Sequence, residues 1–131
     1  MKEWLRGLLG SRGERQAASF LAKNGFQILA RRVANQFGEI DLVTLDGQTV
    51  VFVEVRTRKS TEAGHPAESV TAGKQQRLTR TALAFLKQNG LLEHRSRFDV
   101  IAVIWPDGQK SPQIEHYKNA FEPAGNGQFF A

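Results

Sequence analysis

The sequence contains no cysteine, which excludes disulfide bonds and thiolate metal sites and fits a reducing compartment. It has no apolar run close to the ~18 residues that a membrane-spanning helix needs. The opening stretch MKEWLRGLLG places charges between its few apolar residues, which is untypical of a signal peptide. The three histidines lie far apart without the spacing of metal ligands, so we assign them no role. We expect a cytoplasmic protein that does not contact a membrane.

Repeats and low-complexity tracts are also missing, and a chain of 131 residues with 40% hydrophobic content fits one domain with its own core. Lys and Arg outnumber Asp and Glu by 18 to 13, which gives a net charge of +5. This excess favours a polyanionic partner such as nucleic acid. The alternative is ordinary charge that keeps the protein in solution.

Periodicity and turn residues predict the order αβββαββ, an α/β domain with a mixed sheet. The first helix is expected to begin at Ser11, which has capping-box spacing to Glu14, and to stop at Gly25. Pro66 is expected to open the second helix, which ends near Asn89. The five strands are expected at residues 26–33, 38–45, 48–56, 97–105 and 113–121. The single domain covers residues 1–131, and its termini (1–10 and 122–131) are expected to be flexible.

The stretch VVFVEVRTR, residues 50–58, carries a carboxylate, Glu54, in a strand that otherwise suits burial on both faces. Asp46 and Gly47 favour a tight hairpin before it. If these two residues alone form the turn, Asp41 lies diagonal to Glu54, about 7 Å away between Cβ atoms. If the loop runs from Asp46 to Thr49, the two acids oppose each other at about 5 Å. Both registers place them on one face, whereas a three-residue loop without a bulge would separate them.

Two carboxylates on one face repel each other, and a divalent cation would remove the conflict. Mg²⁺ is the natural candidate because it binds carboxylate and carbonyl oxygens while it keeps several waters. The alternative is that Arg56, Arg58 or another base pairs with Asp41 and Glu54.

Both predicted helices add polar side chains to this region. Glu14 falls within the apolar arc of the first helix, so it is expected to face the core; the alternative is that it only caps the helix. Lys74 and Gln75 fall within the apolar arc of the second helix, where they could contact a phosphate or a water. The alternative is that both side chains extend past the edge of the core to solvent.

The combination of RGE on a helix, GFQIL, GEIDLV, FVEVRTR, a lysine on the next helix and RFDV resembles the bacterial YraN family of uncharacterised proteins over nearly the whole chain. That family is similar to the PD-(D/E)XK nuclease superfamily, especially the Holliday junction resolvases, which implies a restriction-endonuclease-like fold. The resemblance implies that Asp41, Glu54 and the Val55 carbonyl bind a metal ion, Mg²⁺ or Mn²⁺. Glu14 matches the helix carboxylate that completes such a site.

Arg56 stands where the superfamily has lysine. Arginine can stabilise negative charge on a phosphate, but it cannot act as a base near neutral pH. The expected activity is metal-dependent hydrolysis of phosphodiester bonds in structured or branched DNA, in which Arg56, Lys74 and Gln75 stabilise the transition state. The alternatives are a noncatalytic nucleic-acid-binding protein that keeps the fold, or an adaptor in a DNA-processing complex.

Basic residues that could neutralise phosphates without reading sequence are expected to bind the nucleic acid: Arg31, Arg32, Arg58, Lys59, Arg77 and Arg80. Asp99 is expected to pair with Arg97 or a neighbouring base. A homodimer is expected only from the similarity to resolvases.

Overall fold

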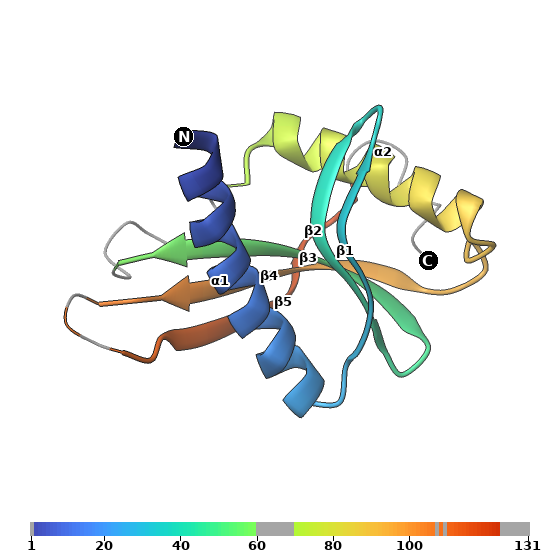
Figure 1. Cartoon of the computed structure of the whole chain (residues 1–131). Helices are drawn as coiled ribbons and strands as arrows, with labels where there is room; N and C mark the ends of the chain where they lie inside the picture. The colour runs from blue at the N-terminus through green and yellow to red at the C-terminus, as the bar shows by residue number, and fades with distance from the viewer. Residues whose placement is uncertain (1, 60–69, 107, 109, 124–131) are drawn as a thin grey trace.

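The computed structural model describes residues 2–59, 70–106, 108 and 110–123, and it describes side chains from Arg12 onward. Two helices and five strands follow one another in the predicted order αβββαββ (Figure 1). The helices are α1 (Lys2–Lys23) and α2 (Ala72–Gln88), and the strands are β1 (Gln27–Asn35), β2 (Gly38–Asp46), β3 (Thr49–Arg58), β4 (Ser96–Ile104) and β5 (Gln113–Phe121). None of the helices in the described part of the chain is long and apolar enough to cross a membrane.

The five strands form one sheet in the order β1-β2-β3-β4-β5. Neighbouring strands run antiparallel except β3 and β4, which run parallel and are connected through α2. A parallel pair needs a crossover connection, and α2 supplies it. The predicted mixed sheet flanked by helices is therefore confirmed.

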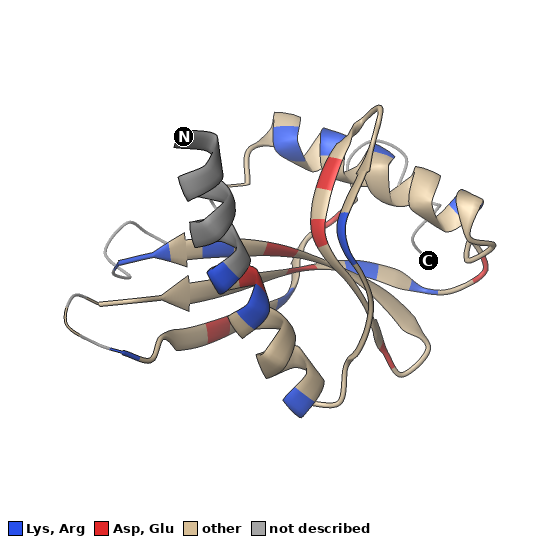
Figure 2. Ribbon diagram, in the orientation of Figure 1, with Lys and Arg blue, Asp and Glu red and all other residues tan. Residues whose placement is uncertain are grey.

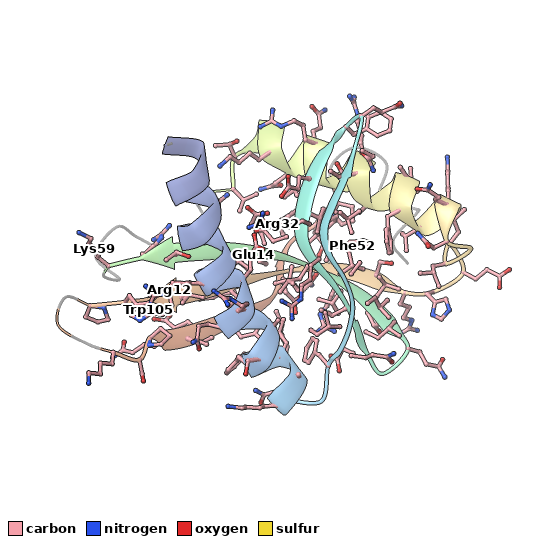
Figure 3. The ribbon with its side chains drawn as sticks, in the orientation of Figure 1. Arg12, Glu14, Arg32, Phe52, Lys59 and Trp105 are labelled. Atoms are coloured by element: carbon pink, nitrogen blue, oxygen red, sulfur yellow. The ribbon has the colours of Figure 1, made fainter. Side chains whose placement is uncertain are left out.

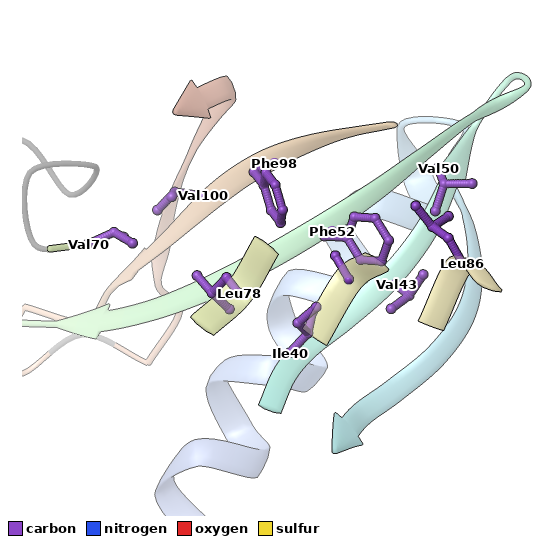
Figure 4. Close-up of a cluster of buried hydrophobic side chains, with 10 residues drawn as sticks. Ile40, Val43, Val50, Phe52, Val70, Leu78, Leu86, Phe98 and Val100 are labelled. Carbon is purple, nitrogen blue, oxygen red and sulfur yellow. The ribbon is translucent and has the colours of Figure 1, made fainter. Parts of the chain in front are cut away.

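The two helices cover opposite faces of the sheet, and β3 lies between them. Val51 and Val53 face α1, whereas Val50 and Phe52 face α2; Figure 4 shows the cluster on the α2 side. This position explains why the strand is apolar at successive residues, because side chains on both faces leave water. The helices contribute Ala17, Ala18 and Leu21 from α1, and Leu78, Ala82 and Leu86 from α2.

Both helices begin elsewhere than predicted. The expected start at Ser11 is wrong, because α1 begins at Lys2 and runs through Ser11, so Ser11 and Glu14 form no capping box. The strong helix formers of residues 2–10 outweigh two glycines, each of which costs only about 1 kcal/mol. The expected start at Pro66 is also wrong: α2 begins at Ala72, where the Thr71 side chain accepts the Lys74 N–H and caps the helix. Pro66 and the tail beyond Pro123 lie outside the described residues.

Gly13 brings α1 into close contact with β3. A Cβ atom at this position would lie 2.4 Å from the Thr57 Oγ1 atom, so any larger residue would force the Thr57 side chain or the helix to shift. The contact fixes the neighbouring residue, Glu14, over the sheet.

We expect Gly13→Ala to destabilise the protein by about 1–2 kcal/mol, because the clash outweighs the helix-propensity gain of alanine. Removing the hydroxyl in the Gly13→Ala/Thr57→Ala variant should restore stability, since the next atoms lie at 3.8 and 3.9 Å. Urea unfolding of both variants and of Thr57→Ala alone checks this. Equal stability of Gly13→Ala and wild type would contradict it.

Candidate functional site

The register of the β2–β3 hairpin brings two carboxylates together. Its pairs run from Asp46↔Thr49 to Leu42↔Val53, and the next step along both strands places Asp41 opposite Glu54. This is the register in which Asp41 opposes Glu54 directly, but the loop differs from both expected loops, because Asp46 pairs with Thr49 and the turn consists of Gly47 and Gln48. The two acids also lie close enough for the charge of Asp41 to raise the pKa of Glu54. The prediction that they share one face of the sheet is therefore confirmed.

Asp41 is held by the backbone of the neighbouring strand. Its Oδ2 atom accepts a hydrogen bond from the Val55 N–H at 2.8 Å, in the place where the β2–β3 ladder has ended. The N–H and C=O groups of one residue in an extended strand point to the same edge, so the Val55 carbonyl also faces this side of β3. The second carboxylate oxygen of Asp41, Oδ1, can therefore bind another partner.

Burial gives both acids unusual proton affinities. Burial, with repulsion from Glu14 and Glu39, raises the pKa of Asp41 from 3.8 to about 6, although the Val55 N–H opposes this rise. Burial and repulsion from Asp41 raise the pKa of Glu54 from 4.5 to about 7, although Arg56 and Lys74 oppose it. A cation between the two carboxylates would relieve the repulsion that causes part of both shifts.

Arg56 lies beside Glu54 but does not form a close pair with it. The Arg56 Nη2 atom is 3.6 Å from Glu54 Oε1, which is too long for a hydrogen bond. Its Nε and Nη2 atoms are buried and have no hydrogen-bond partner among the described residues. Buried donors without an acceptor are costly, so an acceptor that reached this guanidinium would bind favourably.

Glu14 reaches the same region from α1. It forms an ion pair with Arg32 of β1, with 2.9 Å between Oε2 and Nε, and Figure 3 shows the two side chains facing each other. The side chain of Glu14 is only 14% exposed, as its place in the apolar arc predicts. The helix-capping alternative is wrong, because Glu14 lies inside α1 and binds a residue 18 positions away.

The amino-terminal half of α2 forms the other wall of the site. A pocket of about 180 Å³ lies between the start of β2, Glu54 and α2, and Lys74 and Arg77 line it. Lys74 is near enough to oppose the rise in the pKa of Glu54. Gln75 is placed differently, since its side-chain amide donates to the Val70 carbonyl at 2.9 Å and thus fixes the entry to the helix. Its contact with a substrate stays a prediction.

The residues expected to bind nucleic acid come from β1, β3 and α2, except Lys59, which directly follows β3; Figure 2 shows basic segments of these elements and the acidic segments of β2. All are exposed except Arg58, which is half-buried. Arg77 joins the pocket directly, whereas Arg32 is engaged with Glu14. The set consists of Arg31, Arg32, Arg58, Lys59, Arg77 and Arg80.

One buried ionic cluster lies apart from this site. Asp99, which is fully buried, binds Arg97 at 2.9 Å and His116 at 2.7 Å, and it accepts the Asn119 N–H. Its expected pairing with Arg97 is confirmed. The spacing of the histidines does not predict this role of His116; the alternation of β5, which turns Ile114 and His116 to the same face, is the signal that indicates it.

The side chains around Asp41 and Glu54 suit a hard cation. Carboxylate and carbonyl oxygens are the ligands that Mg²⁺ and Mn²⁺ prefer, and Mg²⁺ often uses only one or two carboxylates together with water and phosphate. Within residues 2–59, 70–106, 108 and 110–123, no group of three or more acidic, histidine or cysteine side chains is arranged to hold a metal ion. The carboxylates of Asp41 and Glu54 are therefore the two candidate ligands for a cation, whereas Glu14 is bound to Arg32.

Comparison with known proteins places these residues within a family. A UPF0102 protein of Rhodopirellula baltica is 44% identical over 125 residues, which cover 93% of this chain and 75% of that protein. A UPF0102 protein of Geobacter sulfurreducens is 44% identical over 119 residues, which cover 89% of this chain and 91% of the relative. A third, of Geotalea daltonii, is 46% identical over 116 residues, which cover 88% and 91%.

The model of the uncharacterised protein family UPF0102 matches residues 13–103, a segment that begins at the helix glycine and contains both strands of the carboxylate pair. This agrees with the resemblance to the YraN family that the sequence motifs indicate. The chain therefore belongs to the uncharacterised protein family UPF0102.

Proposed function

We propose that this protein is a cytoplasmic, metal-dependent endonuclease that hydrolyses phosphodiester bonds in structured or branched DNA. The observation that carries the proposal is the half-buried pair of Asp41 and Glu54, whose pKa values are raised beside a pocket lined by Lys74 and Arg77. Burying two like charges is unfavourable, and perturbed carboxyl groups in a hollow mark a site that serves chemistry. The net charge of +5 suits a polyanionic substrate.

Each side chain would have a separate task. Asp41, Glu54 and the Val55 carbonyl would hold Mg²⁺ or Mn²⁺, which when bound would polarise the phosphate and supply a water of lowered pKa. Arg56 would donate its unpaired N–H groups to the phosphate oxygens and stabilise the charge that develops on them. Lys74 and Arg77 would orient the backbone of the DNA in the pocket.

Arg56 also favours a second candidate, a nucleic-acid-binding protein without catalysis. The guanidinium cannot accept a proton from the attacking water near neutral pH. Such a protein would bind branched DNA with an affinity that falls steeply with salt, but it would not cleave it.

The test is incubation of the purified protein with labelled four-way junction, flap, single-stranded DNA and RNA in Mg²⁺ or Mn²⁺, with EDTA as the reference. We expect cation-dependent cleavage of the branched DNA. The Asp41→Asn/Glu54→Gln variant should be slower by on the order of 100-fold or more, because it loses the anionic oxygens that hold the cation.

A matched control is Glu93→Gln, which removes an exposed carboxylate near the start of β4 and should cleave like the wild type. Cleavage that is unchanged in the double variant would refute the assignment of Asp41 and Glu54. Salt-sensitive binding without cleavage by the wild type would favour the second candidate.

A further inference from the structure

Arg32 has an unusual backbone on the edge strand β1. Its φ angle is 50°, a left-handed conformation that is uncommon for residues other than glycine and that recurs at functional sites. The β1–β2 register pairs Arg31 with Leu42 and Val33 with Ile40, so Arg32 lies directly across from Asp41. The extended backbone of a regular strand carries no such strain, so the pairing of β1 with β2 does not by itself explain this conformation.

The side chain of Arg32 donates a hydrogen bond to Glu14, with 2.9 Å between Nε and Oε2. The hydrogen bond to Glu14 is the main reason why the pKa of Arg32 is raised, and Glu39 and Asp41 add smaller attractions. Glu14 in turn lies close enough to raise the pKa of Asp41. The carboxylate of Glu14 thus lies next to the pair of Asp41 and Glu54, but Arg32 compensates its charge.

The two partners differ in exposure. The side chain of Arg32 is 46% exposed, whereas that of Glu14 is 14% exposed. A long exposed guanidinium can change partner at small cost, because an exposed ion pair stabilises a protein by only about 0.2–1 kcal/mol. The same freedom would let it bind a phosphate at the rim of the site.

We propose that Arg32 is a positioning residue that lowers the cation affinity of the site by holding the carboxylate of Glu14. This inference rests on the proposed function, since it assumes that a cation binds at Asp41 and Glu54. The guanidinium and a divalent cation compete for the same acceptor, so removing Arg32 makes Glu14 available to the cation. The same removal deprives bound DNA of a phosphate contact, and the two affinities change in opposite directions.

The test measures Mn²⁺ binding by the loss of the electron paramagnetic resonance signal of free Mn²⁺, without nucleic acid. Arg32→Asn is the informative variant, because asparagine removes the charge and tolerates the left-handed backbone. We expect it to bind Mn²⁺ about threefold to fivefold more tightly than the wild type, as for the loss of one exposed competing ion pair. Arg32→Lys keeps the charge and should bind Mn²⁺ like the wild type.

The Glu14→Gln background provides the matched control. If Arg32 acts through Glu14, Arg32→Asn should not change Mn²⁺ affinity in that background, whereas a general effect of charge would persist. A second measurement follows fluorescence anisotropy of a labelled four-way junction in EDTA. There, Arg32→Asn should weaken binding by about threefold to fivefold, because one phosphate contact is lost.

Tighter Mn²⁺ binding that depends on Glu14, together with weaker junction binding, supports the inference. Unchanged Mn²⁺ affinity, an increase that persists in Glu14→Gln, or a change of both affinities in the same direction overturns it. The proposed function fails separately, if the wild type takes up no Mn²⁺ or if Asp41→Asn takes it up as the wild type does. Thermal melts of all variants establish that they are folded.

Discussion

At pH 8 and without divalent cations, the Asp41→Asn/Glu54→Gln variant is expected to be more stable than the wild type by about 4 kcal/mol. A pKa raised from 3.8 to about 6, or from 4.5 to about 7, corresponds on its own to about 3 kcal/mol. The expected gain is smaller than the sum of the two contributions, because the repulsion between Asp41 and Glu54 counts only once and Arg56 loses a favourable neighbour. The Val55 N–H keeps its acceptor, since the asparagine carbonyl can replace Asp41 Oδ2.

The dependence on pH has a definite sign. Both carboxyl groups hold protons more firmly in the folded state than in the unfolded state, so folding takes up protons between about pH 4 and pH 7. The free energy of unfolding of the wild type should therefore fall as the pH rises through this range. The double variant lacks both groups, so its free energy of unfolding should equal that of the wild type near pH 4.

Urea unfolding of both proteins in EDTA from pH 4 to pH 8 measures this effect. Glu39→Gln is the matched control, because it removes an exposed carboxylate next to the pair and should change stability by less than about 0.5 kcal/mol. Added Mg²⁺ should stabilise only the wild type, since only the wild type binds it. The difference in stability between the double variant and the wild type should therefore become smaller. Wild-type stability that is constant or rises from pH 5 to pH 8 would contradict the prediction. A gain in stability with a loss of activity would show that the acids are kept for function.

Asp99→Asn is expected to destabilise the protein by about 3 kcal/mol, and by roughly 10 °C in melting temperature. Burial alone would raise the pKa of this carboxyl, but hydrogen bonds from His116, Arg97 and the Asn119 N–H outweigh burial and lower it. The asparagine amide would present N–H donors to groups that are donors themselves. The asparagine oxygen could still accept from Arg97 Nε and the Asn119 N–H, but its NH2 group would replace Oδ2, and Arg97 Nη2 would keep only its bond to Asp46, at 2.9 Å.

Asp99 also supports an irregular part of the sheet. The β4–β5 register shifts between Phe98 and Val100, and Asn119, which has a φ angle of 52°, donates its N–H to the carboxylate. The bulge therefore depends on this acceptor. Thermal melts at pH 7 check the prediction, with the exposed Glu93→Gln as the reference, which should melt like the wild type. A change of less than about 1 kcal/mol for Asp99→Asn would mean that the cluster contributes little.

Much of the fold follows from local patterns. The apolar run around Phe52 predicts a strand buried on both faces, and Asp46 with Gly47 predicts the hairpin, because burial and turn geometry act over a few residues. Gly90 ends α2 as expected, with a φ angle of 67°. The helix starts were missed, since the helix formers before Ser11 and the cap at Thr71 are weaker signals than the residues that suggested other boundaries.

The sequence by itself determined that Asp41 and Glu54 share a face for a two-residue or a four-residue loop, because the period of a strand is two residues, and the structure has such a register. Only the tertiary structure decided which groups oppose those charges. The pairing of Glu14 with Arg32 and the cluster of Asp99 with His116 join residues from different elements. Such contacts depend on how helices and strands pack, and side-chain electrostatics is decided by distances of a few ångströms that no local pattern encodes.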